Sequence, residues 1–320
     1  MKNKEVKEGF EENLKTKLKI FDISFNSIFD GEGTRVVLFL QECSLRCSWC
    51  HLPHSRLSNS PLLYNNELCD LCGNCVEICS NAVHSIKNQK HFVDRKKCTL
   101  CGDCINSCHK SSNERQTGPL YLPTKEYIVE DLFDKIKPHL SIVKDIGGIT
   151  LSGGEALLQS KGIRKLLTLC KEYNIHTCIE TSGTLPINYY HGLKELVDSW
   201  IFGMRFIINK SQDIKLYNTN CHNYKYLLEE GYQIYPNLTV IPNYTDTDYY
   251  LKMCMNFFKM HNISLVYLNF WNPETSHYYD LSGITKEFTL SSEETIYKSK
   301  KKVINFFQSN HIAIEYIENI

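Results

Sequence analysis

The sequence carries no net charge, because its 36 Lys and Arg residues equal its 36 Asp and Glu residues. A balanced chain gives no electrostatic reason to expect nucleic acid or an acidic membrane as a partner. Long apolar runs are also absent, and none approaches the roughly 18 residues that a membrane-spanning helix needs. The charged start at Met1–Glu5 has no apolar stretch behind it, so it does not predict a signal peptide. These absences favour a soluble, cytoplasmic protein that binds neither nucleic acid nor a membrane.

Cysteine, by contrast, is in excess. The chain has 15 cysteines, and 11 of them lie between Cys43 and Cys108, a window of 66 residues. In a short secreted chain this density would predict disulfides. Here the chain is 320 residues long and its cysteines recur at short, regular spacings, which is typical of metal ligands. The remaining four are expected to be small buried core residues: Cys170, Cys178, Cys221 and Cys254.

Composition divides the chain into three regions. Residues 1–54 contain a polar start and an apolar strand-type run, residues 55–123 are cysteine-rich, and residues 124–320 alternate between helix and strand patterns. The alternation predicts a parallel α/β sheet, open or barrel-like. Helices are expected near residues 125–137, 161–173, 189–197, 224–230, 248–260 and 292–308. Strands are expected near residues 36–40, 149–152, 176–181, 200–208, 233–241, 265–270 and 312–316.

Polar or glycine-rich clusters follow several of the expected strands. They occupy residues 42–50, 153–155, 182–183 and 272–273. In parallel sheets and barrels, the loops at the carboxyl ends of the strands build the ligand site. We therefore expect all four clusters to meet on one face of the sheet.

The first cluster contains Cys43, Cys47 and Cys50 at the spacing C-x3-C-x2-C. Three thiolates can hold three irons of a 4Fe–4S cube and leave the fourth iron without a protein ligand, as catalytic metal sites do. A closed zinc site is the alternative, in which His51 or His54 would be the fourth ligand.

The cysteine-rich region holds two complete bacterial ferredoxin runs of the form C-x2-C-x2-C-x3-C. In two-cluster ferredoxins the fourth cysteine of each run ligates the other cluster. The proline that usually follows it is replaced by Ser80 and His109. Two closed clusters suited to electron transfer are predicted, with zinc ribbons as the alternative. One site would comprise Cys69, Cys72, Cys75 and Cys108, and the other Cys98, Cys101, Cys104 and Cys79.

Three motifs carry a family resemblance. Asp30-Gly31-Glu32-Gly33-Thr34-Arg35, followed by a strand, the cysteine triplet and His51, resembles the opening of glycyl radical enzyme activating enzymes. Residues 147–155 (Gly-Gly-Ile-Thr-Leu-Ser-Gly-Gly-Glu) and 180–183 (Glu-Thr-Ser-Gly) are similar to that family's second and third signatures. With the two-cluster insert, the resemblance covers most of the chain in the family's order. The chain looks most similar to the ferredoxin-bearing activases, including the YjjW-type branch.

The resemblance implies a partial (β/α)6-type radical S-adenosylmethionine barrel, formed by residues 1–54 and 124–320. A ferredoxin-like domain with two [4Fe–4S] clusters would be inserted at residues 55–123. The implied cofactors are three [4Fe–4S] clusters and S-adenosyl-L-methionine, bound at the open iron of the triplet cluster. The implied contacts to S-adenosylmethionine are Trp49, Gly153, Gly154, Glu155, Glu180, Ser182 and Arg205. The two glycines are expected to allow close approach of the backbone to the ligand.

The implied function is that of an activase, an oxidoreductase. It would reductively cleave S-adenosylmethionine and abstract a hydrogen atom from a glycine of a partner glycyl radical enzyme. The electron would come from a low-potential donor such as flavodoxin or ferredoxin. Two alternatives stay open: a radical S-adenosylmethionine enzyme acting on a small molecule or another peptide, and an electron-transfer iron–sulfur protein.

Four positions depart from the family pattern. Gly203-Met204-Arg205 stands where activases commonly have Asp-x-Lys, and Glu180 stands where Asp is typical. Asn237 occupies a position often held by Arg, and Trp271 stands at the usual His. These departures bear on the contacts to the S-adenosylmethionine carboxylate and on any nearby cation site, and they leave the eleven cluster cysteines untouched.

Overall fold

The computed structural model describes residues 15–207 and 214–317. The charged start at Met1–Glu5 and the last residue of the strand expected at 200–208 therefore lie outside the described residues. Within the described ranges, no helix is long and apolar enough to cross a membrane.

A nine-stranded sheet forms the body of the protein, in the spatial order β13-β12-β11-β10-β9-β8-β2-β1-β7. Strand β2 and the strands from β8 to β13 run parallel to one another, and β1 and β7 pair antiparallel at one edge. The sheet is open, because β13 and β7 are edge strands, so the expected α/β partial barrel is confirmed. The strands are β1 Lys17–Ser27, β2 Thr34–Leu40, β7 Lys125–Ile128, β8 Gly147–Gly153, β9 His176–Thr181, β10 Ser199–Gly203, β11 Gln233–Val240, β12 Leu265–Phe270 and β13 Ala313–Ile317.

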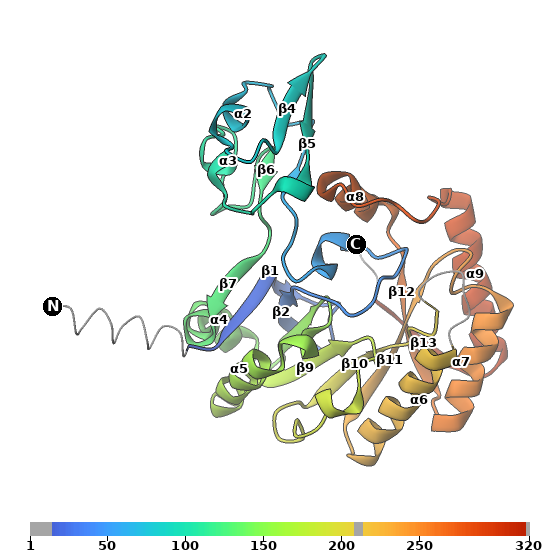
Figure 1. Cartoon of the computed structure of the whole chain (residues 1–320). Coiled ribbons are helices and arrows are strands. Elements are labelled where there is room, and N and C mark those ends of the chain that lie inside the picture. Colours follow the sequence, from blue (N-terminus) through green and yellow to red (C-terminus); the bar gives the residue numbers. More distant parts are fainter. Residues whose placement is uncertain (1–14, 208–213, 318–320) are drawn as a thin grey trace.

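Crossover helices cover the outer face of the sheet (Figure 1). Their apolar faces pack against the buried strands and form one core with them. The strands of a parallel sheet are usually shielded from water. These helices are α4 Val129–Val143, α5 Ser160–Glu172, α6 Ile214–Glu229, α7 Asp248–His261 and α9 Glu293–Ser309. A further short helix, α8 His277–Ser282, lies away from this face, beside the cysteine-rich residues (Figure 1). Short 3-10 turns complete the body: η1 Pro53–Arg56, η3 Ala156–Gln159, η4 Ile187–Tyr189 and η5 Pro273–Ser276.

Two expected helices are corrected. The one near residues 125–137 begins only at Val129, because residues 125–128 form β7 and pair with β1. Residues 189–197 form turns after η4, not a helix. Gly192 has φ +68°, a left-handed conformation that interrupts a right-handed helix.

The cysteine-rich residues form a separate lobe that projects beyond one end of the sheet (Figure 1). Its two halves repeat one backbone pattern. Leu71 and Leu100 both have φ +62°, and the left-handed Gly73 and Gly102 each precede a short helix. The elements are β3 Leu63–Tyr64, α2 Asn74–Ile78, β4 His84–Lys87, β5 Lys90–Val93, η2 Arg95–Lys97, α3 Asp103–Asn106 and β6 Leu120–Tyr121.

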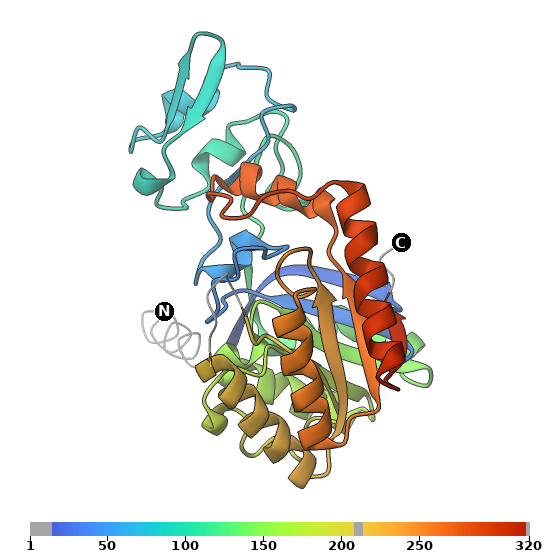
Figure 2. The same ribbon diagram turned by 90° about the vertical axis from the view of Figure 1, so that its right-hand side faces the viewer.

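Arg95 anchors this lobe to the body. Its Nε donates to the carbonyl oxygen of Leu62 at 2.8 Å, and its Nη2 donates to the carbonyl oxygen of Leu281 in α8 at 2.6 Å. A Cβ on Gly283 would lie 2.4 Å from Nη1 of Arg95. Tyr279, also in α8, donates from its hydroxyl to the carbonyl oxygen of Ser48 at 3.0 Å. Helix α8 therefore lies between the lobe and the loop that carries the first three cysteines (Figure 2).

Replacing Arg95 with Ala should loosen α8, because two carbonyl oxygens lose a charged donor. We expect amide hydrogens of residues 277–283 to exchange about tenfold faster, as a loss of about 1.4 kcal/mol of local stability implies. Hydrogen exchange read by mass spectrometry measures this. Lys96→Ala, at an exposed neighbour, is the control. Equal exchange in both variants would show that Arg95 is not an anchor.

Gly183, directly after β9, illustrates how tightly the body is packed. It has φ +70°, and a Cβ there would lie 2.2 Å from the ring of the buried Phe202. Gly192 has a similar φ of +68°. The nearest atom to a Cβ placed there would be Nη1 of Arg164, at 3.5 Å and exposed to solvent.

Comparing these two glycines separates backbone strain from overpacking. Gly192→Ala should cost about 1 kcal/mol, since only the left-handed φ opposes it. Gly183→Ala should cost about 3 kcal/mol or more, because the Phe202 ring must also move within the core. The midpoint of thermal unfolding, followed by circular dichroism without oxygen, should fall further for Gly183→Ala. Similar midpoints for the two variants would contradict the packing described here.

Candidate active site

A cavity of about 450 Å³ opens at the carboxyl ends of the parallel strands. Three of the four clusters expected to meet there line it: the cysteine loop, the Gly153-Gly154 turn and Ser182. Asn272 and Pro273 are not among the described residues that line the cavity. The carboxyl ends of β10, β11 and β12 add Arg205, Asn237, Thr239 and Asn269.

The loop of three cysteines forms one wall of this cavity. Cys43, Cys47 and Cys50 all line it, and each has a free thiol. The loop is held by its own backbone: the N–H of Cys50 donates to the carbonyl oxygen of Cys47 at 3.2 Å. Two arginines brace it from outside, since Arg46 donates to the carbonyl oxygen of Cys43 at 2.6 Å and Arg56 to that of Cys47 at 3.2 Å. The three thiols are thus displayed toward one space.

These thiols resist ionisation on their own. Burial raises the pKa of Cys43 and of Cys47 to about 12, and it raises the pKa of Cys50 as well. The charge of Cys50 further raises the pKa of Cys43 and of Cys47, and the charge of Cys43 raises that of Cys47. A metal centre supplies the positive charge that three such thiolates need. The donor set therefore fits a cluster with three protein ligands, and sulfur as the soft ligand suits iron–sulfur chemistry.

The zinc alternative required a fourth ligand. His54 is buried and His51 is half-buried, and desolvation lowers the pKa of both to about 4, so both are neutral. His51 lines the cavity, while the ring of His54 packs against those of Phe21 and Tyr278. His54 is not among the described residues that line the cavity which the three thiols face.

The two glycines before Glu155 serve strand packing. Gly153 has φ +102°, and a Cβ there would lie 2.5 Å from the backbone nitrogen of Leu40 in β2. A Cβ on Gly154 would lie 2.1 Å from the carbonyl oxygen of Glu42. Sequence reasoning expected these glycines to admit a ligand. Both do line the cavity, but the contacts that forbid a side chain come from β2 and the cysteine loop.

Glu155 lies behind the cavity wall. Its side chain is fully buried and is not among the described lining residues. One oxygen accepts from the hydroxyl of Thr181 at 2.9 Å, and the other accepts from the N–H of Ser182 at 2.9 Å and from its hydroxyl at 2.5 Å. Burial raises the pKa of this carboxyl, and the hydrogen bonds from Ser182 and Thr181 oppose that rise. Glu155 thus fixes the loop after β9.

The floor of the cavity carries charges of both signs. Asp30 and Glu180 line it, and burial raises the pKa of both carboxyls. Glu180 accepts from the hydroxyl of Ser152 at 2.5 Å. The guanidinium carbon of Arg205 lies 5.5 Å from the ring centre of Trp49, and both residues line the cavity. The positive charge of Arg205 also lowers the pKa of the Glu180 carboxyl, which opposes the effect of burial.

The departures from the family pattern lie at the same end of the sheet. Asn237, within β11, is fully buried, and its Oδ1 accepts from Nδ2 of Asn269 at 3.3 Å. Nδ2 of Asn237 and Oδ1 of Asn269 are buried without a partner. Both amides line the cavity, so each has one group available to a ligand. Asn269 was missed from the sequence, where it is one polar residue within an apolar strand.

Trp271 forms part of an apolar wall. It is 4% exposed and packs with Leu45, Cys47 and Trp49. Its ring centre lies 6.3 Å from that of His51. The indole therefore packs behind the cysteine loop and is not among the described residues that line the cavity, at the position where the family pattern has an imidazole.

The lobe brings the remaining eight expected cysteines into two groups. One small cavity is lined by one set of four cysteines, and a second cavity by the other set. Each group takes three cysteines from one run and the fourth from the other run. All eight thiols are free, so the donor sets fit two closed clusters. The first set is Cys69, Cys72, Cys75 and Cys108, and the second is Cys79, Cys98, Cys101 and Cys104.

The other four cysteines lie elsewhere in the body. Cys170, Cys178 and Cys254 are fully buried, as expected for small core residues. Cys221, in α6, is only partly buried and packs against the edge of the core.

Comparison with known proteins identifies relatives along most of the chain. It is 33% identical over 266 residues to the trans-4-hydroxy-L-proline dehydratase activating enzyme of Clostridioides difficile, covering 79% of this chain and 84% of the relative. It is 29% identical over 264 residues to the 4-hydroxyphenylacetate decarboxylase activating enzyme of C. difficile strain 630 (78% and 80%). It is 30% identical over 257 residues to the indoleacetate decarboxylase activating enzyme of Tractidigestivibacter scatoligenes (74% and 78%).

No family model matches the chain. Among solved structures, a domain of a pyruvate-formate lyase-activating enzyme from Bacteroides vulgatus ATCC 8482 aligns with a TM-score of 0.38 at 14% identity, covering 53% of this chain and 98% of that one. The sequence relationship covers most of both chains. The chain belongs to the glycyl radical enzyme activating enzymes, the activases of the radical S-adenosylmethionine class.

Proposed function

We propose that this activase binds three [4Fe–4S] clusters, one in the body and two in the lobe. Family membership implies a 4Fe–4S cluster, S-adenosylmethionine and a glycyl radical enzyme as partner. The count of three rests on the grouping of the eleven cysteines into one set of three and two sets of four. The domain division proposed is the one expected from the sequence, with the insert at residues 55–123.

The single observation that carries the catalytic proposal is the position of the three-cysteine loop. Its thiols face a cavity that the carboxyl ends of the parallel strands also line. When bound there, the cluster and S-adenosylmethionine together supply one-electron cleavage of the sulfonium and abstraction of a hydrogen atom from glycine. The chain supplies the rest: it holds the ligand at a fixed distance and keeps water away from the reacting atoms.

Arg205 is the residue we assign to the carboxylate of S-adenosylmethionine. Its guanidinium lies at the cavity wall beside Trp49, and its charge lowers the pKa of Cys47 and Cys50, which places it near the cluster site. A guanidinium can bind a carboxylate with two hydrogen bonds. No acidic residue accompanies it at position 203, where glycine stands. Arg205 thus supplies the positive charge at this wall.

The neighbouring residues support this arrangement. We assign Gly153, Gly154 and Ser182 to the cavity wall that receives the methionine end, with Glu155 holding Ser182 in place. Glu180 contributes a polar group to the floor. The flat face of Trp49 closes the same wall next to Arg205.

We propose that the partner is a glycyl radical enzyme, and that the protein works in a reducing cytoplasm where its 15 cysteines stay unpaired. The electron would reach the lobe from a low-potential donor such as flavodoxin or ferredoxin. Leu62 and Leu122, near the points where the lobe joins the body, line the second four-cysteine cavity. This supports placing the second four-cysteine site nearer to the body than the first.

Replacing Cys43, Cys47 and Cys50 with Ala should abolish cleavage of S-adenosylmethionine to 5′-deoxyadenosine after anaerobic reconstitution and reduction with dithionite. Iron should fall from about twelve to about eight atoms per chain, because three four-iron clusters become two. Chromatography of the nucleoside and an iron assay measure both. Cleavage that survives the triple replacement would refute the assignment of the catalytic cluster.

Arg205→Met should weaken binding of S-adenosylmethionine by about tenfold to a hundredfold, the effect of losing a charge-assisted pair worth about 1.5–3 kcal/mol. Arg205→Lys should have an affinity between those of the unaltered protein and Arg205→Met, because an ammonium keeps the positive charge but lacks the planar guanidinium with its paired donors. Equilibrium binding to the reconstituted protein measures this. Arg164→Met removes a guanidinium that contacts Gly192 instead of the cavity, and should leave affinity unchanged. Unchanged affinity in Arg205→Met would refute the role given to Arg205.

The activase function itself is tested with the partner. Mixing the reduced protein and S-adenosylmethionine with a glycyl radical enzyme encoded beside its gene should produce a protein-bound organic radical by electron paramagnetic resonance. The radical should be absent when the triple Cys→Ala variant replaces the unaltered protein. The protein could cleave S-adenosylmethionine and yet produce no radical on any glycyl radical enzyme tested. That outcome would favour a small molecule or another peptide as substrate.

A further inference from the structure

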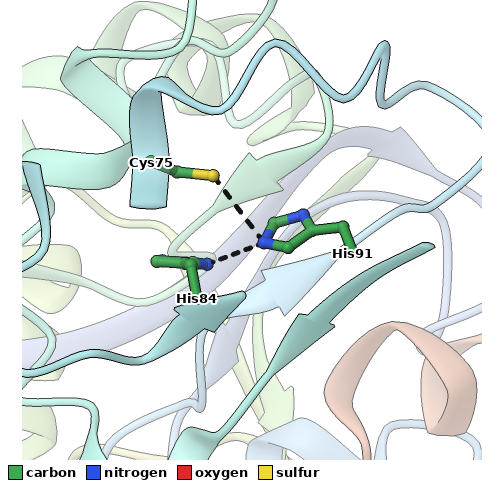
Figure 3. Close-up of side chains that lie close together, drawn as sticks. All are labelled: Cys75, His84 and His91. Carbon is green, nitrogen blue, oxygen red and sulfur yellow. Dashed lines mark hydrogen bonds between the residues drawn. The ribbon is translucent and has the colours of Figure 1, made fainter. Parts of the chain in front are cut away.

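The two four-cysteine sites of the lobe share a backbone plan but differ in their surroundings. The first site is lined by His91, and a pair of histidines lies beside it. His84, in β4, and His91, in β5, are both buried and are joined through Nδ1 of His84 and Nε2 of His91 at 3.0 Å (Figure 3). Neither residue belongs to the ferredoxin spacing, so sequence reasoning did not select them.

His91 contacts two sulfurs of the first site. Its Nδ1 lies 3.8 Å from Sγ of Cys69, and its Nε2 lies 3.7 Å from Sγ of Cys75. Both distances suit a hydrogen bond to sulfur. Figure 3 shows Cys75 and His84 on either side of the same ring nitrogen of His91. Each ring nitrogen thus faces a different sulfur of one cysteine set.

The tautomer of His91 decides which contact carries the proton. A neutral ring has one N–H, on either Nδ1 or Nε2. With the proton on Nδ1, the N–H is directed at Sγ of Cys69, and Nε2 can accept from Nδ1 of His84. With the proton on Nε2, the N–H lies between Nδ1 of His84 at 3.0 Å and Sγ of Cys75 at 3.7 Å. A thiolate bound to iron has no proton to donate, so the ring protonated on Nδ1 gives the direct N–H···S contact.

The ring is also held in place. Nδ1 of His84 contacts it from one side, and the ring of Tyr64 meets it nearly edge-on, with centres 4.6 Å apart. Since His91 is only 9% exposed, water has little access to the contact. A fixed donor in a dry site interacts more strongly than one in water.

The second site lacks this feature. Within the part of the chain that the structure describes, no imidazole nitrogen is recorded in a hydrogen bond to the sulfurs of its four cysteines. Its lining includes the apolar side chains of Leu62, Val83, Leu100 and Leu122, together with His84, which bonds to His91 instead.

We propose that His91 donates an N–H···S hydrogen bond to the first closed cluster of the lobe and makes its reduction potential more positive than it would otherwise be. The inference rests on the proposed function for the presence of that cluster. Reduction adds negative charge to a cluster and its thiolates, and the positive end of an N–H dipole stabilises that charge. His91 is a positioning and tuning residue, since it holds no iron itself.

The test uses the full chain with Cys43, Cys47 and Cys50 replaced by Ala, so that only the two closed clusters remain. A redox titration followed by electron paramagnetic resonance gives their two midpoints. His91→Phe keeps a ring but removes the donor, and should shift one midpoint to more negative values while leaving the other in place. His91→Gln retains an N–H donor and should shift the same midpoint less.

His109→Phe is the matched control. His109 lies beside the same site, but its Nε2 pairs with the carboxylate of Asp70 at 2.9 Å. Its replacement should leave the midpoints where they are, so an equal shift from His109→Phe would overturn the hydrogen bond as the cause. No shift from His91→Phe, in protein that retains about eight irons, would overturn it as well.

A second measurement detects the contact directly by spectroscopy. Labelling with ¹⁵N-histidine should give a weak nitrogen coupling to one reduced cluster in pulsed electron paramagnetic resonance, and His91→Gln should remove it. Absence of the coupling in the unsubstituted ring would refute the contact. Protein that binds zinc through Cys75, His84 and His91, with about four irons missing, would overturn both this inference and the count of three clusters.

Discussion

The contact between the ends of β2 and β8 is the constraint on which the rest of the site depends. Past the last strand pair, the N–H of Gly154 donates to the carbonyl oxygen of Leu40 at 2.9 Å, and that of Glu155 to the carbonyl oxygen of Glu42 at 2.8 Å. The two backbones approach so closely that only glycine fits at 153 and 154. This contact sets the cysteine loop over the sheet, and it turns Glu155 inward to hold the loop after β9. Every wall of the cavity is then fixed by a neighbouring backbone.

Much of this arrangement could be predicted from the sequence, because it depends on spacing. Cysteines at fixed intervals can form a three-ligand or four-ligand set only in a few ways, and alternating patterns mark buried parallel strands. Strand β1 escaped prediction since its exposed and buried residues do not alternate cleanly. The inward turn of Glu155 and the pairing of Asn237 with Asn269 depend on distances between strands, which periodicity does not encode. His91 is one more such case, since its nearest sulfur is 16 residues away in the chain.

The lobe surrounds a repeated backbone pattern with different side chains. The two halves match at Leu71 and Leu100 and at Gly73 and Gly102, so ligand geometry is duplicated. What differs is the contact made by the hairpin of β4 and β5: His91 contacts two sulfurs of the first set, whereas His84 lines the second site but is bonded to His91. Hydrogen bonding and burial, more than the ligands, distinguish one iron–sulfur site from another of the same type. Two sites of the same type in one chain can then hold electrons with different affinities.

Arg95 connects the lobe to helix α8, so the lobe cannot be removed without affecting α8. Its guanidinium fills the space that a side chain at residue 283 would occupy, and it satisfies a carbonyl oxygen of α8. Helix α8 in turn holds the backbone at Ser48 through Tyr279. A version of the protein without the lobe would keep every residue of the barrel, yet the carbonyl oxygen of Leu281 would lose its charged donor, in the helix that contacts the cysteine loop. Replacing the lobe with a different ferredoxin-like domain would therefore require changes in α8 as well.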